Sequence, residues 1–194
     1  METNVSGFTF FSTFDSGNLA SVEAIPEDLH PLNGLPDVSP DEMPVEKGGP
    51  LLPSDHSFRI WTRPDCSGTE FENGNRTWFY FGLRGGPSQH EELEDLNAGS
   101  GDLMIRLTVM NLNKQSKLFS QGMAPIVMVV PLPHTIYSFG KDKSALKQAY
   151  PHGWERIRDK PTYWTLNNEN KNASNFVVSF RVKCNPKVRC FVFV

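Results

Sequence analysis

Aromatic and β-branched residues gather in short runs along this chain, and Gly, Pro, Asn and Asp separate the runs. This spacing is typical of many short strands rather than of long amphipathic helices. Within SFRIWTR, for example, Phe58 and Ile60 point to one face of a strand and Arg59 points to the other. The pattern predicts strands at residues 8–14, 19–24, 58–63, 76–84, 103–110, 126–130, 175–183 and 188–194.

One predicted strand, RTWFYFGLR, has apolar side chains on both faces. Trp78 and Tyr80 lie on one face. Phe79 and Phe81 lie on the other, so the strand is expected at the centre of a sheet and covered on both sides. Because turn signals separate the strands and helix is scarce, we predict an all-β fold, an antiparallel β-sandwich of about seven to nine strands with long loops.

Two segments between the strands contribute little to a core. Residues 26–53 combine prolines with acidic residues; proline removes backbone donors, and the acids stay solvated. Residues 85–101 are acidic between glycine-rich ends. We therefore expect two flexible loops, 26–53 and 85–101, within a single domain that spans residues 1–194. A short helix is expected at 144–149, before Pro151, and one helical turn at 91–96 is an alternative within the acidic loop.

Length and charge narrow the possible functions. A chain of 194 residues with 38% hydrophobic positions can bury one core. The net charge of -3 provides no basic face, so no nucleic acid is expected as a partner. No run approaches the ~20 apolar residues of a membrane span, so no membrane partner is expected. The N-terminus has no secretory signal pattern, so the protein is predicted to be cytoplasmic and also nuclear as an alternative. Three cysteines are an odd number for a disulfide framework.

One short motif has the spacing of a zinc-binding pair. His152 and Glu155 read H-x-x-E, but a catalytic zinc needs a third protein ligand, and no histidine follows Glu155. Cys184 and Cys190 are too far apart in sequence for a zinc pair. We interpret them as buried residues on either side of a hairpin turn at Asn185. The sequence therefore predicts no metal site.

Patterns for covalent and phosphate chemistry are missing as well. The chain has no G-x-S-x-G, and GLRGG lacks the lysine and following helix of a phosphate-binding loop. No catalytic residue is predicted. Polar density is high instead in FDSGN, in residues 61–79, in NLNKQSKLFSQGMAP and in WERIRDKPTYW. Solvated turns explain these stretches equally well, and Trp154, Ile157 and Arg158 alternatively form one face of a helical turn.

Four blocks carry a resemblance to a known family. FDSGNLASVE, WTRPDCSGTEFENGNRTWFYFGLRG, IRLTVMNLNKQSKLFSQGMAP and WERIRDKPTY, in this order, resemble the N-terminal domain of the cytosolic carboxypeptidases. The likeness spans about residues 8–163, interrupted by the proline-rich segment, the acidic loop and residues 133–152. After Tyr163 only scattered apolar matches remain.

The resemblance implies a zinc metallocarboxypeptidase of the M14 type, a hydrolase that removes glutamates from tubulin and other proteins. In this family a β-sandwich domain precedes a catalytic domain that holds Zn through an H-x-x-E pair and a further histidine. None of these zinc ligands transfers to this chain, because WERIR matches a block of the sandwich domain instead. We therefore expect no cofactor in this chain, no activity of the chain alone, and the Zn in a catalytic domain that is absent from it.

The polar residues of the matching blocks form the candidate site. The resemblance implies that they pack on a catalytic domain in cis and border the approach of glutamylated tubulin tails. Lys114 and Lys117 would attract such acidic tails, unless these lysines are merely solvated. The candidate interdomain or substrate-approach residues are Asn111, Asn113, Lys114, Gln115, Lys117, Gln121, Trp154 and Arg156.

A second function stays open, that of a free-standing module that binds acidic, glutamylated tails or a regulatory partner. The residues are equally compatible with a fragment, a splice form and a truncated gene. If a catalytic domain is missing, we expect an exposed apolar surface within residues 176–194, an unpaired strand edge at VRCFVFV (residues 188–194) and self-association.

Overall fold

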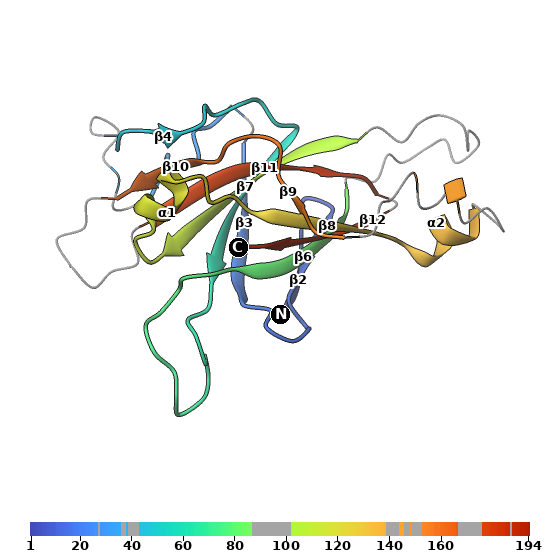
Figure 1. Ribbon diagram of the computed structural model, residues 1–194, viewed down its shortest axis with the longest axis horizontal. Coiled ribbons are helices and arrows are strands. Elements are labelled where there is room, and N and C mark those ends of the chain that lie inside the picture. Colours follow the sequence, from blue (N-terminus) through green and yellow to red (C-terminus); the bar gives the residue numbers. More distant parts are fainter. Residues whose placement is uncertain are drawn as a thin grey trace.

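Two stacked β-sheets of six strands each make up the fold, which we describe from a computed structural model (Figure 1). The short helices α1 (Ser116–Ser120) and α2 (Pro133–Ser138) lie at opposite ends of the sandwich (Figure 1). The structure describes residues 1–26, 28–35, 38, 43–86, 102–138, 144–145, 148, 153–166, 176–186 and 188–194.

Sheet A is antiparallel throughout. In spatial order it contains β1 (Glu2–Val5), β2 (Phe8–Phe11), β6 (Tyr80–Gly85), β12 (Val188–Phe193), β8 (Ile126–Pro131) and β9 (Glu155–Arg156). The central strand β12 pairs with β6 on one side and with β8 on the other. The expectation of an unpaired edge at residues 188–194 is therefore wrong, because both edges of β12 are hydrogen-bonded to neighbours.

Sheet B contains one parallel pair. In spatial order it consists of β3 (Leu19–Ile25), β5 (His56–Thr62), β7 (Leu103–Leu112), β11 (Phe176–Cys184), β10 (Thr162–Thr165) and β4 (Lys47–Gly48). The strands β5 and β7 run parallel, because the chain crosses to sheet A between them and forms β6 there. The other described pairs of sheet B are antiparallel.

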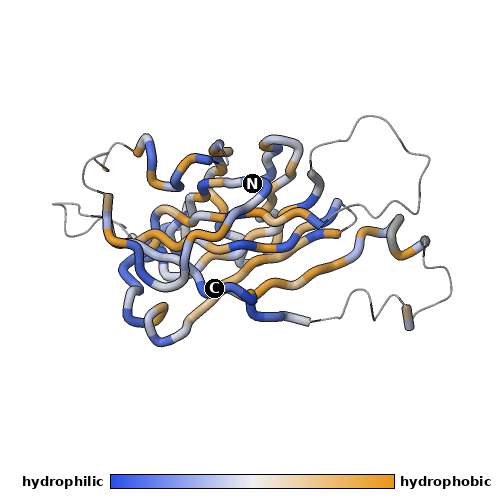
Figure 2. The backbone as a smooth tube through the Cα atoms, turned by 90° about the horizontal axis from the view of Figure 1, so that it is seen from above, coloured by the Kyte–Doolittle hydropathy of each residue, from blue (hydrophilic) through white to orange (hydrophobic). Residues whose placement is uncertain are grey.

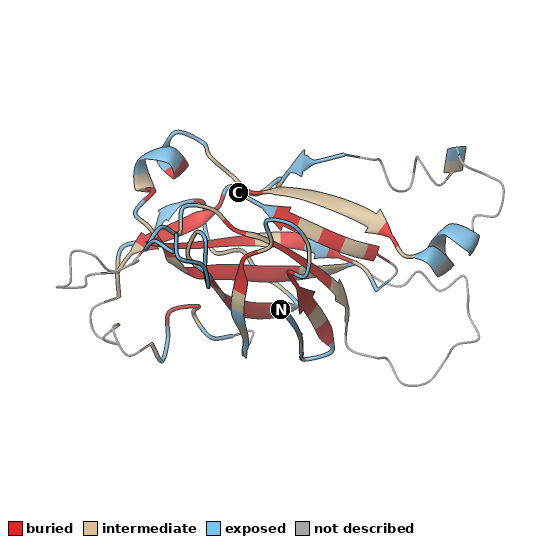
Figure 3. Cartoon of the chain, turned by 90° about the horizontal axis from the view of Figure 1, so that it is seen from below, coloured by how far each residue is buried: buried red, intermediate tan, exposed pale blue. Residues whose placement is uncertain are grey.

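The core lies between the sheets and is rich in aromatic side chains. Alternate residues of each strand point inward, so Phe8 and Phe10 of β2 meet Phe58 of β5 with ring centroids 5.4 and 4.9 Å apart. Figure 3 shows these inner positions as buried, and Figure 2 shows hydrophobic residues following the strands. Cys184 and Cys190 are buried free thiols, as expected from the sequence.

The predicted all-β sandwich is confirmed, and its strand inventory is larger than expected. Each predicted strand is present, although β6 begins only at Tyr80. The sequence pattern does not predict β1, β4, β9 or β10, which raise the number of strands in the described part of the chain to twelve, above the expected number of about seven to nine. The strand β6 is central as predicted, but Tyr80 is only half-buried, so the outer face of β6 is not fully covered.

The described part of residues 26–53 packs on the outer face of sheet B. Leu32 is fully buried there and forms a second apolar cluster with Met110, Trp164 and Val177. The described part of this segment therefore has packing contacts that its proline content does not predict, because its leucine lies against apolar residues of the sheet.

Three arginines on the outer face of sheet B hold this segment in place. Arg59 on β5, Arg106 on β7 and Arg181 on β11 each donate hydrogen bonds to its backbone carbonyls. The accepting oxygens belong to Pro31 and Asn33 for Arg59, to Leu52 for Arg106 and to Pro53 for Arg181. Proline lacks a donor but keeps its carbonyl, so a proline-rich segment can be held by donors from the sheet.

Two sequence predictions fall partly outside the described residues. Of the acidic loop, residues 87–101 are not described. Of the expected helix at 144–149, residues 144, 145 and 148 are helical and the others lie outside the described residues.

Candidate interdomain surface

Asn111 extends the pairing between β5 and β7. Parallel backbone pairing ends at Ile60 and Val109, and beyond it the amide of Asn111 bonds to Thr62. Its Oδ1 accepts from the Thr62 backbone N–H at 2.9 Å, and its Nδ2 donates to the Thr62 carbonyl at 2.9 Å. An amide side chain offers the same donor and acceptor as a backbone residue, so it fixes these strand ends to each other.

Asn113 and Gln115 hold the end of the long loop between β5 and β6, which projects from the sandwich in teal to green in Figure 1. The Asn113 backbone N–H donates to the Arg76 carbonyl at 2.9 Å, and its side-chain Oδ1 accepts from the Arg76 N–H. Gln115 Nε2 donates to the Thr77 carbonyl at 2.6 Å. Gln115 is itself buried, so these amides brace the loop rather than forming an open polar surface.

Lys114, Lys117 and Gln121 are exposed at and beside helix α1. The helix buries Phe119, whose ring lies 5.4 Å from that of Phe176. The Gln121 backbone N–H donates to the Lys117 carbonyl at 3.1 Å, a helical hydrogen bond at the C-terminal end of α1. Among the described residues neither lysine forms an ion pair, so both charges face solvent.

Trp154 and Arg156 lie at the edge of sheet A. The alternative of a helical turn is wrong here, because Arg156 is opposite Ile126 in the β8–β9 pair. Arg156 Nη1 donates to the Gly122 carbonyl at 3.2 Å, which ties β9 to the residues after α1. The ring of Trp154 contacts Tyr80 at a centroid distance of 5.8 Å. Trp154 therefore belongs with aromatic residues of sheet A and not with the polar residues of segment 111–121.

These rings form what we call the aromatic surface. It consists of Phe11, Phe14, Tyr80, Trp154, Phe191 and Phe193. Phe14 lies 4.6 Å from Tyr80 and 5.6 Å from Phe191, both in edge-on geometry. Tyr80 and Phe193 are direct cross-strand partners, with ring centroids 5.5 Å apart. Such contacts between rings stabilise the surface beyond the burial of area alone.

Strand alternation places the aromatic surface on the outer face of sheet A. Phe81 of β6 is fully buried in the core, so its neighbours Tyr80 and Gly82 point outward. A Cβ on Gly82 would approach the Phe11 ring to 2.3 Å, so glycine lets this ring lie directly on the strand. The described residues leave the surface partly open, since Phe193 is 36% exposed and Trp154 is 41% exposed.

Two arginines border the aromatic surface. Arg84 and Arg189 are direct cross-strand partners on β6 and β12. Arg84 forms an ion pair with Glu2 at 2.8 Å and lies over the Phe11 ring at 5.7 Å. The Arg189 Nε is buried and has no hydrogen-bond partner among the described residues. An acceptor from another surface could satisfy this donor only after a shift of the Arg189 side chain, because the chain itself shields the atom.

Of the aromatic surface, the candidate residues predicted from the sequence include only Trp154. A usable signal was present in RCFVFV, where Phe191 and Phe193 alternate with Cys190 and Val192, so that both faces of the strand are apolar. Apolar residues on both faces indicate a strand that is covered on both sides. The partly open outer face of β12 is the departure from that rule.

Comparison with curated proteins identifies the relatives of the chain. Cytosolic carboxypeptidase-like protein 5 of Homo sapiens is 40% identical over 187 residues, which cover 93% of this chain and 16% of the human protein. The protein of the same name from Rattus norvegicus is 38% identical over 183 residues, covering 93% of this chain and 17% of its own length. The chain belongs to the cytosolic carboxypeptidase family.

Cytosolic carboxypeptidase 3 of Mus musculus is a more distant relative, 25% identical over 114 residues and 59% of this chain. No family model matches the chain. As expected from the four sequence blocks, the match corresponds to the N-terminal region of the relatives. The chain spans about one-sixth of the length of the proteins named cytosolic carboxypeptidase-like protein 5, since it covers 16% of the human protein and 17% of the rat protein.

The described residues of this cytosolic carboxypeptidase domain do not fit a zinc ion. Within the ranges that the structure describes, no three His, Cys, Asp or Glu side chains gather in a way that could hold a metal. The H-x-x-E motif is not tested, because His152 lies outside the described residues. None of the described helices is long and apolar enough to cross a membrane.

Proposed function

We propose that the chain is the N-terminal, non-catalytic β-sandwich domain of a zinc metallocarboxypeptidase of the tubulin-deglutamylase type. In this proposal the aromatic surface packs on the catalytic domain of the same polypeptide, and the zinc belongs to that catalytic domain. The observation that carries the proposal is a partly open aromatic face on a chain that matches only 16% of the length of its human relative.

The composition of the aromatic surface supports a protein partner. Exposed apolar patches with a polar margin mark interaction sites, and the centres of interfaces are enriched in aromatic residues and arginine. Trp154 and Phe193 supply exposed rings, and Arg189 supplies a donor that the described residues leave unpaired. A partner that offers an apolar area and a carbonyl or carboxylate beside Arg189 would complement all three.

The proposal also assigns a role to the lysines of segment 111–121. The substrate class is the glutamate-rich tail, as on tubulin, and Lys114 and Lys117 present exposed positive charge to it. Arg156 connects β9 to Gly122, so the residues after α1 adjoin the edge of sheet A that carries Trp154. A cytoplasmic location is part of the proposal and is supported by the printed names of the relatives.

The test compares side-chain accessibility in two contexts. A chimera is prepared in which this chain replaces the matching region of human cytosolic carboxypeptidase-like protein 5. Hydroxyl-radical labelling, read by mass spectrometry, is measured for the chimera and for the 194-residue chain alone. We expect Tyr80, Trp154 and Phe193 to be labelled several-fold more slowly in the chimera.

The matched control is Phe71, which lies in the loop between β5 and β6 and is 71% exposed. Its labelling rate is expected to be equal in both proteins. Equal rates for Trp154 and Phe193 in a chimera that releases glutamate would contradict the proposed packing. That outcome would favour the alternative function, a free-standing module that binds acidic tails.

A further inference from the structure

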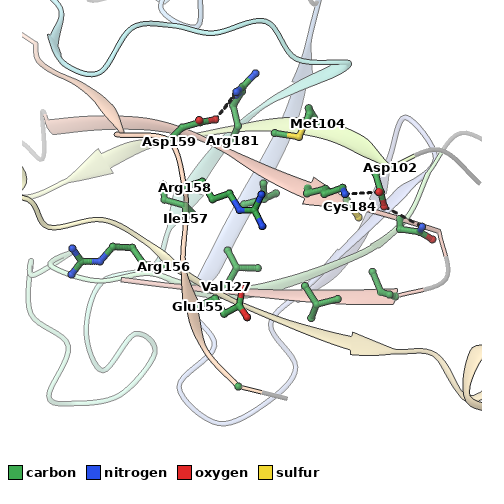
Figure 4. Close-up of a pocket in the computed structure, with 16 residues that line it drawn as sticks. Asp102, Met104, Val127, Glu155, Arg156, Ile157, Arg158, Asp159, Arg181 and Cys184 are labelled. Atoms are coloured by element: carbon green, nitrogen blue, oxygen red, sulfur yellow. Dashed lines mark hydrogen bonds and ion pairs between the residues drawn. The ribbon is translucent and has the colours of Figure 1, made fainter. Parts of the chain in front are cut away.

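A pocket opens between the two sheets at the side where β8 and β9 of sheet A diverge from β11 of sheet B (Figure 4). Its volume is about 600 Å³. The apolar part of the wall consists of Val127, Val129, Ile157, Val182 and Val188. Because the buried Cys184 also lines the pocket, it reaches from the surface to the core.

Two of the cations around the pocket are neutralised by ion pairs on sheet B. Arg181 Nη2 lies 2.5 Å from Asp159 Oδ2, and Lys183 Nζ lies 2.5 Å from Asp102 Oδ2. Figure 4 shows both pairs at the margin of the pocket. A ligand therefore gains little from these four groups.

Arg158 is the cation that remains available. Its side chain extends into the space between the sheets in Figure 4, whereas Arg156 points away from it and bonds to the Gly122 carbonyl. Among the described residues Arg158 takes part in no ion pair. Glu155 lies beside Val127 at the side of sheet A and is likewise unpaired within that set.

One free guanidinium beside an apolar wall fits a carboxylate on a short aliphatic stem. A guanidinium binds a carboxylate through two parallel hydrogen bonds, and the methylene groups of the stem can contact the valines. The glutamate side chain has this composition. Aspartate has one methylene fewer, and inorganic phosphate has no apolar part, so both are poorer fits.

We propose that this pocket binds a glutamate side chain of an acidic peptide, with its carboxylate on Arg158 and its methylenes against Val127 and Val182. The choice of a glutamate-rich ligand rests on the proposed function, while the site itself rests on the pocket and its free guanidinium. Glu155 opposes binding by repulsion and limits the affinity.

The experiment titrates the 194-residue chain, labelled with ¹⁵N, with N-acetyl tetraglutamate amide at low ionic strength. We expect amide shift changes at Ile157, Arg158 and Val182 and a Kd of about 1 mM. Arg158→Gln is expected to weaken binding at least about tenfold, because it removes a charge-assisted hydrogen bond pair. Glu155→Gln is expected to tighten binding about twofold to fivefold, because it removes a like charge near the ligand.

The matched control is Lys160→Gln, which removes one positive charge from the same segment outside the pocket lining. Its Kd should stay within about twofold of that of the unchanged chain. A tetra-aspartate peptide should bind at least about threefold more weakly, and tetraglutamine should not bind.

Three results would overturn the proposal. The first is the lack of shift changes at ~10 mM peptide, about ten times the expected Kd, with a folded spectrum. The second is an equal loss of affinity in Arg158→Gln and Lys160→Gln. The third is equal binding of the glutamate peptide and of aspartate peptide or phosphate. The measurement needs no catalytic domain, so its failure leaves the labelling test of the proposed function intact, and the converse also holds.

Discussion

The outer faces of the two sheets are built alike but are covered differently. Each carries apolar side chains and arginines that point away from the core. On sheet B, residues 28–35 and 43–53 lie over the face, and Trp164 is fully buried beneath them. On sheet A, the described residues leave Trp154 41% exposed. The described residues therefore cover the aromatic outer face of sheet B more fully than that of sheet A, and under the proposed function the catalytic domain covers the latter.

The outward-pointing arginines of the two sheets also differ in whether they have hydrogen-bond acceptors. Arg59 donates to the carbonyl oxygens of Pro31 and Asn33, which belong to the covering segment of sheet B. Arg189 has the corresponding outward position on sheet A, and its buried Nε finds no acceptor among the described residues. Because the chain itself shields this atom from solvent, an acceptor on a partner surface can satisfy it only if the Arg189 side chain shifts outward.

The largest expected effect separates the two tryptophans. Trp164→Ala should lower the free energy of unfolding by about 3 to 5 kcal/mol, because it leaves a cavity beneath the covering segment. Trp154→Ala should cost less than about 1 kcal/mol in the chain alone, because the ring is partly solvated. Urea unfolding followed by far-UV circular dichroism measures both. Equal losses would show that the two faces are equally covered.

A smaller effect is expected from the arginines. Arg59→Met leaves the carbonyl of the buried Pro31 and that of the exposed Asn33 without their donor, which should cost about 1 to 3 kcal/mol and should expose residues 28–35 to proteases. Arg189→Met removes no hydrogen bond within the described chain, so its stability should change by less than about 0.5 kcal/mol. Urea midpoints and the rate of limited proteolysis check the pair. A large loss from Arg189→Met would contradict the assignment of a free donor.

Self-association of the chain tests whether the aromatic surface of sheet A is accessible to other proteins. We expect the chain to self-associate at high concentration through the aromatic surface, and the double variant Trp154→Ser with Phe193→Ser to weaken association about tenfold, which corresponds to about 1.4 kcal/mol. Phe71→Ser, in the loop between β5 and β6, should leave association unchanged. Sedimentation velocity over a range of concentrations measures this. A fully monomeric unchanged chain would remove the prediction.

The two exposed lysines are expected to have a modest effect on rate. In the chimera with the human relative, Lys114→Gln combined with Lys117→Gln should lower the rate of glutamate release about threefold at low salt and should flatten its salt dependence. Lys47→Gln, on β4, combined with Lys160→Gln serves as the charge-matched control, since both lysines are exposed and two charges are removed. If the rate and salt slope do not change, the lysines are solvated only, and the steering role fails.

The smallest effect concerns pH. Burial alone would raise the pKa of Asp102, but hydrogen bonds from Lys183 and Asn185 outweigh it and hold this pKa below its ordinary value of 3.8. The ionised carboxylate is therefore favoured in the folded chain. Its contribution to stability is complete above about pH 4 and is lost as pH falls through the lowered pKa. Asp102→Asn should remove a small part of the acid sensitivity, measured as the urea midpoint at pH 3 and pH 7.

Sequence reasoning works for this fold wherever a strand is long enough to show its own pattern. The run LMIRLTVM becomes β7, and FVVSF becomes part of β11, because β-branched and aromatic residues continue over several positions. The strands β4 and β9 have only two residues each, and they are recognised as strands only by their pairing with β10 and β8. The tertiary contacts that create them leave no periodic signal.

The limits of prediction differ for the candidate site. Trp154 was identifiable as an unusual polar-flanked aromatic residue, but its neighbours Tyr80 and Phe193 come from strands far apart in sequence, and only strand order brings them together. Arg158 is left without an ion pair in the described structure because Arg181 and Lys183 occupy the nearby carboxylates of Asp159 and Asp102. Pairing of this kind is a property of the folded arrangement and not of residue spacing.

The position of β12 in the middle of sheet A has a consequence for biosynthesis. Residues 188–193 leave the ribosome after every other strand of that sheet, yet they join β6 to β8. Until then β1, β2 and β6 can form one half of the sheet and β8 and β9 the other half. No backbone hydrogen bonds join the two halves before β12 is in place. Sheet A must therefore close late, and until then the nascent chain exposes two unpaired inner strand edges, which are the kind of edge that pairs with other chains.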